Sequence, residues 1–375
     1  GEAGQVRRVV HWAPHIPNHF AQLSQQSTTR QSSGTEVLLF ESTQKPNSVH
    51  SLCRPALRAV CKDFEAANVT CFDWFPGPDR ALQFAAGLNK GQVVVSYFEP
   101  VASSFAEVGT RGARSIVLQH SQTRRRACND VAWNPCQDNL LAVALEKLPN
   151  ETSLHVWDIV QASPNNALSQ FLADTPASVE PALPVSEAGG ALDQGSFTVL
   201  SQERLGLIKD ESCTAVRWLP KSASVLVVGS TPGKNALDKS ALRILDIRHP
   251  QGEVLQAARD NLSSSSARAQ VGVGLLAIDP LATDLRRCAT HSGEASDSVV
   301  KIWDLRRASE PLMQVTTPGV PKRLSFCPTG EGVLSALVSS STGGPGAIHV
   351  WMLRSSDAHR ECYQDQGGGK GAASG

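Results

Sequence analysis

The chain has 375 residues, and its 35 Lys and Arg residues balance 35 Asp and Glu residues. A formal net charge of zero argues against a protein that binds nucleic acid by neutralising many phosphates. No apolar run approaches the roughly 18–20 residues that cross a bilayer, and the first residues lack the basic-then-apolar pattern of a secretory signal.

The nine cysteines include no C-x-x-C pair. Their spacing fits neither a zinc site nor a small disulfide scaffold. We therefore expect mostly reduced cysteines, many of them small core residues, in a cytoplasmic protein.

A repeat of three apolar segments runs along the chain. The first segment ends in a bulky residue with Pro two positions later, and it spans 10–14, 72–76, 131–135, 216–220, 276–280 and 324–328. The second spans 82–88, 140–145, 225–229, 288–291 and 333–338. The third covers 37–41, 93–98, 154–159, 242–247, 300–305 and 348–353. The sequence therefore predicts six units.

The segments predict strands, because they are short and alternate apolar with polar residues. Pro after the first segment fits a turn, since Pro cannot continue a ladder. One such sheet cannot bury both of its faces, and radial stacking of the units, as in a β-propeller, solves this. The repeat exceeds a minimal blade, and we assign the surplus to polar inserts at 21–34, 44–62, 161–201 and 230–240. The 161–201 insert is expected to be a flexible excursion.

The pairs Trp157-Asp158 and Trp303-Asp304 are typical of the WD40 repeat. The segments 131–135, 154–159, 216–220, 242–248 and 300–306, together with 11–15 and 87–94, closely resemble the Mio (missing oocyte) family in the same order. Proteins of that family are WD-repeat subunits of the GATOR complex, called SEA in yeast.

The resemblance implies an all-β, WD40-type β-propeller at 1–360, with a disordered tail at 361–375. The family's propeller is followed by an α-solenoid and a zinc-binding domain, and neither is found in this sequence. We therefore expect six blade units that are incomplete or truncated relative to a seven-bladed propeller.

For function, the resemblance implies a non-enzymatic scaffold that acts with other propeller and coat-like subunits. Such a complex promotes TOR complex 1 signalling when amino acids are plentiful. The expected location is cytoplasmic and peripheral at the lysosomal or vacuolar membrane, reached through the complex. No cofactor, small-molecule substrate or nucleic acid is expected.

The repeated aromatic and Asp positions are interpreted as structural. A buried Trp contributes a large apolar area between neighbouring blades, and Asp anchors a strand end. These residues are Trp12, Trp74, Trp133, Trp157, Asp158, Trp218, Asp246, Trp303, Asp304 and Trp351.

Two further patterns do not support chemistry. His11, His15 and His19 have helical metal-ligand spacing, but Pro14 and Pro17 break such a helix. The string 272–277 matches G-x-G-x-x-A, but Pro280 prevents the helix that would hold a pyrophosphate, and the segment aligns with a propeller strand.

A basic run, Arg124, Arg125 and Arg126, precedes a predicted strand. We interpret it first as a solvated inter-blade loop, with an acidic partner as the alternative.

Two rival functions stay open at this point. One is a generic WD40 adaptor that recognises a linear peptide, for example as a ubiquitin-ligase substrate receptor. The other is a propeller hydrolase or oxidoreductase, for which the sequence offers no converging carboxylates, His residues or metal ligands.

Overall fold

The fold is known from a computed structural model. The residues that the structure describes are 10–12, 14, 19–25, 35–43, 56–66, 69–78, 83–97, 115–119, 126–159, 197–200, 205–231, 241–249, 253–258, 272–282, 287–306, 311–339 and 347–353. Within these ranges no helix is long and apolar enough to cross a membrane. The chain divides into two compact units, Gly1–Asp210 and Glu211–Gly375, and each is described by itself.

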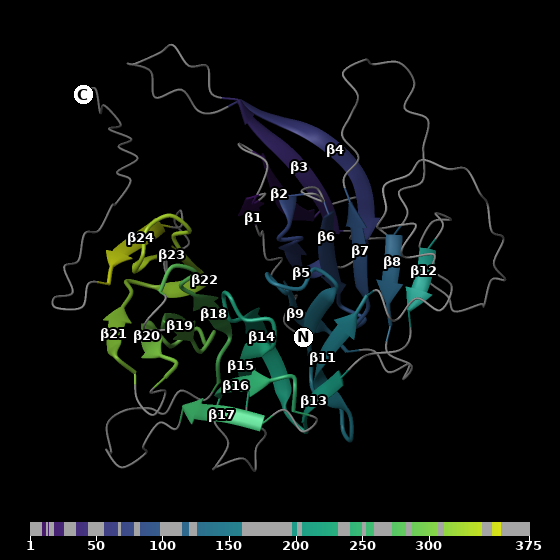
Figure 1. Cartoon of the computed structure of the whole chain (residues 1–375). Coiled ribbons are helices and arrows are strands. Elements are labelled where there is room, and N and C mark those ends of the chain that lie inside the picture. Colours follow the sequence, from purple (N-terminus) through teal and green to yellow (C-terminus); the bar gives the residue numbers. More distant parts are fainter. Residues whose placement is uncertain are drawn as a thin grey trace, which may run out of the picture. The chain divides into compact units, whose positions relative to one another are not determined.

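The described residues of unit 1 form three sheets, whose strands are labelled in Figure 1. Blade 1 comprises β1 (Val10–Trp12), β2 (His19–Gln25), β3 (Thr35–Thr43) and β4 (Ala56–Ala66). Blade 2 comprises β5 (Val69–Trp74), β6 (Gln83–Leu88), β7 (Val93–Tyr97), β8 (Ser115–Leu118) and β12 (Phe197–Leu200). Blade 3 comprises β9 (Cys128–Trp133), β10 (Leu140–Leu145), β11 (Thr152–Asp158) and β13 (Leu205–Lys209).

Unit 2 contains three more sheets in the part of the chain that is described. Blade 4 comprises β14 (Ser212–Trp218), β15 (Val225–Thr231), β16 (Leu242–Asp246) and β17 (Glu253–Ala258). Blade 5 comprises β18 (Leu275–Ile278), β19 (Arg287–His291), β20 (Val299–Asp304) and β21 (Met313–Thr316). Blade 6 comprises β22 (Val320–Phe326), β23 (Val333–Ser339) and β24 (Ala347–Met352).

The predicted apolar segments are strands in the structure, and in blades 2 to 6 they form the first, second and third strands. In blade 1 only the first and third strands, β1 and β3, were predicted, and the second strand β2 was not. Successive strands pair antiparallel, which gives the meander order of a propeller blade. The all-β, six-unit prediction is thus confirmed at the level of the sheets.

The predicted inserts need correction. Strand β2 extends into the insert at 21–34, and β4 occupies part of the insert at 44–62. The end of the 161–201 insert forms β12, which pairs parallel with β8 at the edge of blade 2. Residues 161–196 and the predicted tail at 361–375 lie outside the described residues.

Each core lies between neighbouring blades of a unit. In blade 3, Trp133, Leu141 and Trp157 form one cross-strand row, which belongs to a buried cluster shared with blade 2. In unit 2, Trp303 of blade 5 packs with residues of blade 4, and Trp351 of blade 6 packs with residues of blade 5. The aromatic row of a blade therefore covers the face of the blade before it, as sheet stacking requires.

We call the contact between two neighbouring blades of a unit a seam. At two seams, a Thr hydroxyl and a Gly residue lie where the two blades meet. Thr214 Oγ1 of blade 4 hydrogen-bonds Gly229 O at 3.1 Å and also Val273 O, which leads into blade 5. A Cβ atom on Gly229 would lie 2.5 Å from Val273 Cγ1 and 2.9 Å from its Cβ. Glycine is needed here because the next blade begins where a side chain would be.

We predict that Gly229→Ala lowers the free energy of unfolding by about 1–3 kcal/mol, because the added methyl overpacks a closed interface. Urea unfolding followed by tryptophan fluorescence measures this loss.

The double variant Gly229→Ala/Val273→Ala provides the control. Removing Val273 Cγ1 relieves part of the clash, so the two changes together should cost less than the sum of their separate costs. Additive losses would show that the glycine is not required by this contact.

Candidate protein interaction surfaces

The structure places the repeated Trp and Asp residues mostly inside the blades. Six of the Trp residues and all three Asp residues of the proposed structural set are buried: Trp74, Trp133, Trp157, Trp218, Trp303, Trp351, Asp158, Asp246 and Asp304. The Trp303 indole N–H donates to Thr290 Oγ1 at 2.8 Å. The side chain of Trp12 lies outside the described residues.

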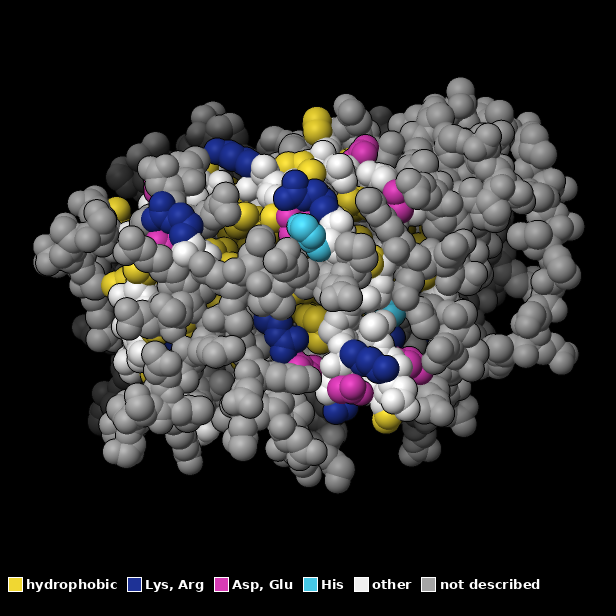
Figure 2. Space-filling view, turned by 60° about the horizontal axis from the view of Figure 1, so that its bottom comes forward, with side chains coloured by type: hydrophobic (Ala, Val, Ile, Leu, Met, Phe, Trp, Pro, Cys, Tyr) yellow, Lys and Arg dark blue, Asp and Glu magenta, His cyan; other side chains and the backbone are white. Residues whose placement is uncertain are grey.

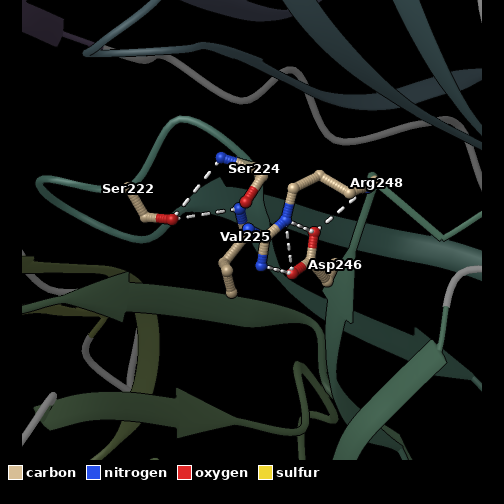
Figure 3. Close-up of polar contacts among 5 residues, drawn as sticks. All are labelled: Ser222, Ser224, Val225, Asp246 and Arg248. Atoms are coloured by element: carbon tan, nitrogen blue, oxygen red, sulfur yellow. Dashed lines mark hydrogen bonds and ion pairs between the residues drawn. The ribbon is translucent and has the colours of Figure 1, made fainter.

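Two of the buried Asp residues orient an Arg at the turn after the third strand. Asp246 Oδ1 accepts from the backbone N–H and from Nε of Arg248, both at 3.0 Å, and its Oδ2 pairs with Arg248 Nη2 (Figure 3). In blade 5, Asp304 holds Arg306 in the same way, with Nη2 at 2.9 Å from Oδ2. Both arginines are exposed, so each blade presents a guanidinium of fixed direction at its rim.

The Asp–Arg pair changes the ionisation of both of its members. The hydrogen bonds from Arg248 lower the pKa of Asp246 from its ordinary 3.8 to about 2, against the opposing effect of burial. The hydrogen bond to Asp246 raises the pKa of Arg248. The ion pair therefore persists at any pH near neutrality.

Blade 3 ends its third strand differently. Asp158 Oδ1 accepts from Asn139 Nδ2 at 2.9 Å, and Val160 stands in the sequence where the other two blades have Arg. The spacing Asp-x-Arg was visible in the sequence at 246–248 and 304–306, but only the structure shows that the Arg side chains return to the Asp carboxylates.

Arg126 of the basic run at 124–126 is neither solvated, as the first interpretation of this run expected, nor open to an acidic partner, which was the alternative. Arg126 is 5% exposed, and its Nη1 donates to Thr152 O at 2.7 Å. Its Nη2 lies 2.9 Å from His155 Nε2 and 3.7 Å from Glu151 Oε2. Burial lowers the pKa of Arg126, and Glu151 opposes this change. The guanidinium therefore binds groups within blade 3 and does not face a partner. Arg124 and Arg125 lie outside the described residues.

Blade 6 has one face that is partly open, which distinguishes it from blades 2, 3 and 5. Strand β23 alternates between buried and more exposed residues, whereas β6, β10 and β19 are buried at every residue. Leu337 and Ile348 are direct cross-strand partners, and they are 41% and 59% exposed. Met352, on the same face, is 39% exposed. We call this surface the open face of blade 6.

The opposite face of blade 6 is closed. Leu334, Ala336 and Trp351 pack against Ala289 and Ile302 of blade 5. An exposed apolar face of this kind is typical of a surface that another protein covers. The alternation in Val333–Ser339 is one of burial and not of residue type, so the face that it exposes is known only from the register of the strands.

Among the described side chains, no group of three or more His, Cys, Asp and Glu residues is placed to hold a metal ion. The G-x-G-x-x-A string continues into strand β18, as expected from its alignment with the repeat. On the face drawn in Figure 2, Lys and Arg side chains lie in separate groups, several of them beside Asp or Glu side chains.

Residues 56–344 match the family model described as MIOS, WD40 repeat. The chain belongs to this family. Its similarity to GATOR2 complex protein MIOS of Dictyostelium discoideum is 26% identity over 298 residues, which cover 76% of this chain and 23% of that protein. It is 27% identical over 274 residues to GATOR2 complex protein MIOS-A of Xenopus laevis, covering 72% of this chain and 26% of that protein.

The same similarity extends over more of the chain in an insect relative. GATOR2 complex protein Mio of Drosophila melanogaster is 20% identical over 348 residues, covering 92% of this chain and 30% of that protein. The chain thus spans between 23% and 30% of the length of these curated relatives. The family resemblance inferred from the WD and strand motifs is confirmed.

Solved structures support the fold. A chain in the structure titled "COPII on membranes, outer coat vertex" matches with a TM-score of 0.53 and 15% identity, covering 94% of this chain and 74% of that chain. A second structure, of the COPII coat assembled on membranes, matches with the same score and covers 41% of its chain. With the family match, these likenesses show a WD40-type β-propeller fold.

We predict that Asp246→Asn lowers stability in a pH-dependent way. Because the folded pKa of Asp246 is about 2 and lies below its ordinary value, its contribution is present above about pH 5 and lost as pH falls toward 2. Since Arg248 is exposed and screened by solvent, we expect a loss of only about 1 kcal/mol at pH 6. This difference between wild type and variant should shrink at pH 3, as measured by urea unfolding at each pH.

Arg248→Met is the matched control, since it removes the partner and keeps the aliphatic stem. It should likewise reduce the change in unfolding free energy between pH 6 and pH 3. The double variant should lose little more stability than either single variant. A loss of equal size at pH 6 and pH 3 would contradict the ion-pair explanation.

Proposed function

We propose that this chain is a non-enzymatic scaffold region of a GATOR2-type complex. The proposal extends to promotion of TOR complex 1 signalling in response to amino acids, from a cytoplasmic complex peripheral to the lysosomal or vacuolar membrane. Membership of the MIOS WD40 family and the names of the matched relatives support it.

The observation that carries the proposal is the open face of blade 6. Leu337, Ile348 and Met352 are apolar and exposed on one side of a sheet whose other side is packed. Their burial against a second protein removes apolar area from water, at about 25 cal/mol per Å². In blades 2 to 5 the corresponding strands are almost fully buried, so we propose that a sister subunit covers this face with an apolar surface.

We propose that the propeller region is 1–360, and that the buried Trp residues and the Asp residues at the strand ends keep the blades rigid. A rigid set of blades presents its loops, rims and end faces for docking, so binding requires no bond to be made or broken.

The open face is tested by affinity purification. We predict that Leu337→Ser/Ile348→Ser in the tagged chain reduces recovery of GATOR2 subunits by at least tenfold relative to wild type, since a loss of about 1.4 kcal/mol of binding energy suffices. Mass spectrometry of the purified material measures the recovery.

Leu312→Ser is the control, because Leu312 is also apolar and 55% exposed but lies beside β21 of blade 5. It should leave recovery unchanged, and all three proteins should unfold at the same urea concentration. Equal recovery by the double variant would exclude the open face, and recovery of a cullin-type ligase by the wild type in place of GATOR2 subunits would favour the peptide-reading adaptor.

A further inference from the structure

The seam between blades 2 and 3 contains a pair of thiols. Cys71 Sγ of β5 and Cys128 Sγ of β9 lie 3.5 Å apart, and both side chains are buried. Both sulfurs lie over Gly87 of β6, where a Cβ atom would contact Cys71 Sγ and would stand 2.5 Å from Cys128 Sγ. Thr70 Oγ1 hydrogen-bonds Gly87 O and Cys128 O beside them.

The seam between blades 4 and 5 has the same construction without thiols. Thr214 and Gly229 stand where Thr70 and Gly87 do, with the same hydrogen bonds to the carbonyl oxygens on both sides of the seam. Counted back from the last residue of the first strand, Ala215 corresponds to Cys71 and Val273 corresponds to Cys128. Packing at this site therefore requires only small apolar side chains, and it does not explain two adjacent thiols.

We propose that Cys71 and Cys128 are a reversible oxidation site, at which hydrogen peroxide forms a disulfide that staples blade 2 to blade 3. A disulfide has an S–S distance of about 2.05 Å, so the sulfurs must approach by about 1.5 Å. The two residues lie on β5 and β9, the first strands of blades 2 and 3, and belong to one buried cluster, so the proposed reaction requires their side chains to move together by this distance.

The reaction balances with peroxide as the oxidant. The Cys71 thiol loses its proton, and the thiolate attacks one oxygen of hydrogen peroxide, which gives a sulfenic acid and a hydroxide that takes up the proton. The Cys128 sulfur then displaces the sulfenic hydroxyl, which leaves with the Cys128 proton as water. Two thiols and one peroxide thus give one disulfide and two waters, with two electrons passing from the sulfurs to the peroxide.

The surroundings assign the order of these steps. Cys71 is 7% exposed and Cys128 is fully buried, so peroxide reaches Cys71 first. Burial raises the pKa of Cys128, and the hydrogen bond with Cys71 adds to this effect, so Cys128 stays a thiol until its partner is oxidised.

The test uses the purified full chain, reduced and then exposed to hydrogen peroxide, with free thiols blocked by N-ethylmaleimide. Before alkylation, we expect a mass decrease of two hydrogen atoms. After alkylation of the denatured chain, we expect two fewer N-ethylmaleimide adducts than in the reduced chain and a peptide pair that links Cys71 to Cys128. The urea midpoint of unfolding should rise with oxidation and return to its starting value in dithiothreitol.

The variant Cys71→Ala/Cys128→Val reproduces the residues of the other seam, so it should fold and its urea midpoint should not respond to peroxide. Cys288→Ser, at another buried cysteine, should respond as wild type does. Oxidation confined to the exposed Cys136, or a peroxide response that persists in the double variant, would overturn the proposal.

Discussion

The packing of one sheet face on the next is the contact on which the rest of this structure depends. Strands β6 and β10 are buried at each of their residues, which a single sheet cannot achieve alone. At the seam between blades 2 and 3, the aromatic row of blade 3 and the Thr70–Gly87 contact cover the facing sides of the two sheets. The blades therefore depend on one another, and a defect in one seam exposes two faces.

This dependence explains which strands were predictable. The first three strands of each blade carry the buried rows, so their apolar pattern is strong in the sequence. The fourth strands were missed because they bury little: β21 alternates between half-buried and exposed residues, and β13 has one buried residue. Strand β12 joins blade 2 from a distant part of the chain, a pairing that no local pattern specifies.

The same limit applies to the candidate sites. The Arg run at 124–126 resembled a solvated loop, but Arg126 finds Thr152 O, His155 and Glu151 within blade 3, and such convergence depends on strand register. The open face of blade 6 was missed for the opposite reason. Its sequence differs from a buried central strand only by Ser335 and Ser339, which is too small a difference to indicate an uncovered face before the register is known.

A comparison of the two Thr–Gly seams shows which residues the fold requires and which positions can vary. Both need a hydroxyl that spans two carbonyls and a glycine that lets the next blade approach, and these features are the same in the two. The side chains beside the glycine differ, being two thiols in one seam and Ala215 and Val273 in the other. Because packing constrains only the size of these side chains, their functional groups can vary without loss of the fold. The same holds at the turns after the third strands, where two blades have an Asp–Arg pair and a third has an Asp–Asn pair. Function in this chain is therefore to be sought at positions that packing leaves undetermined.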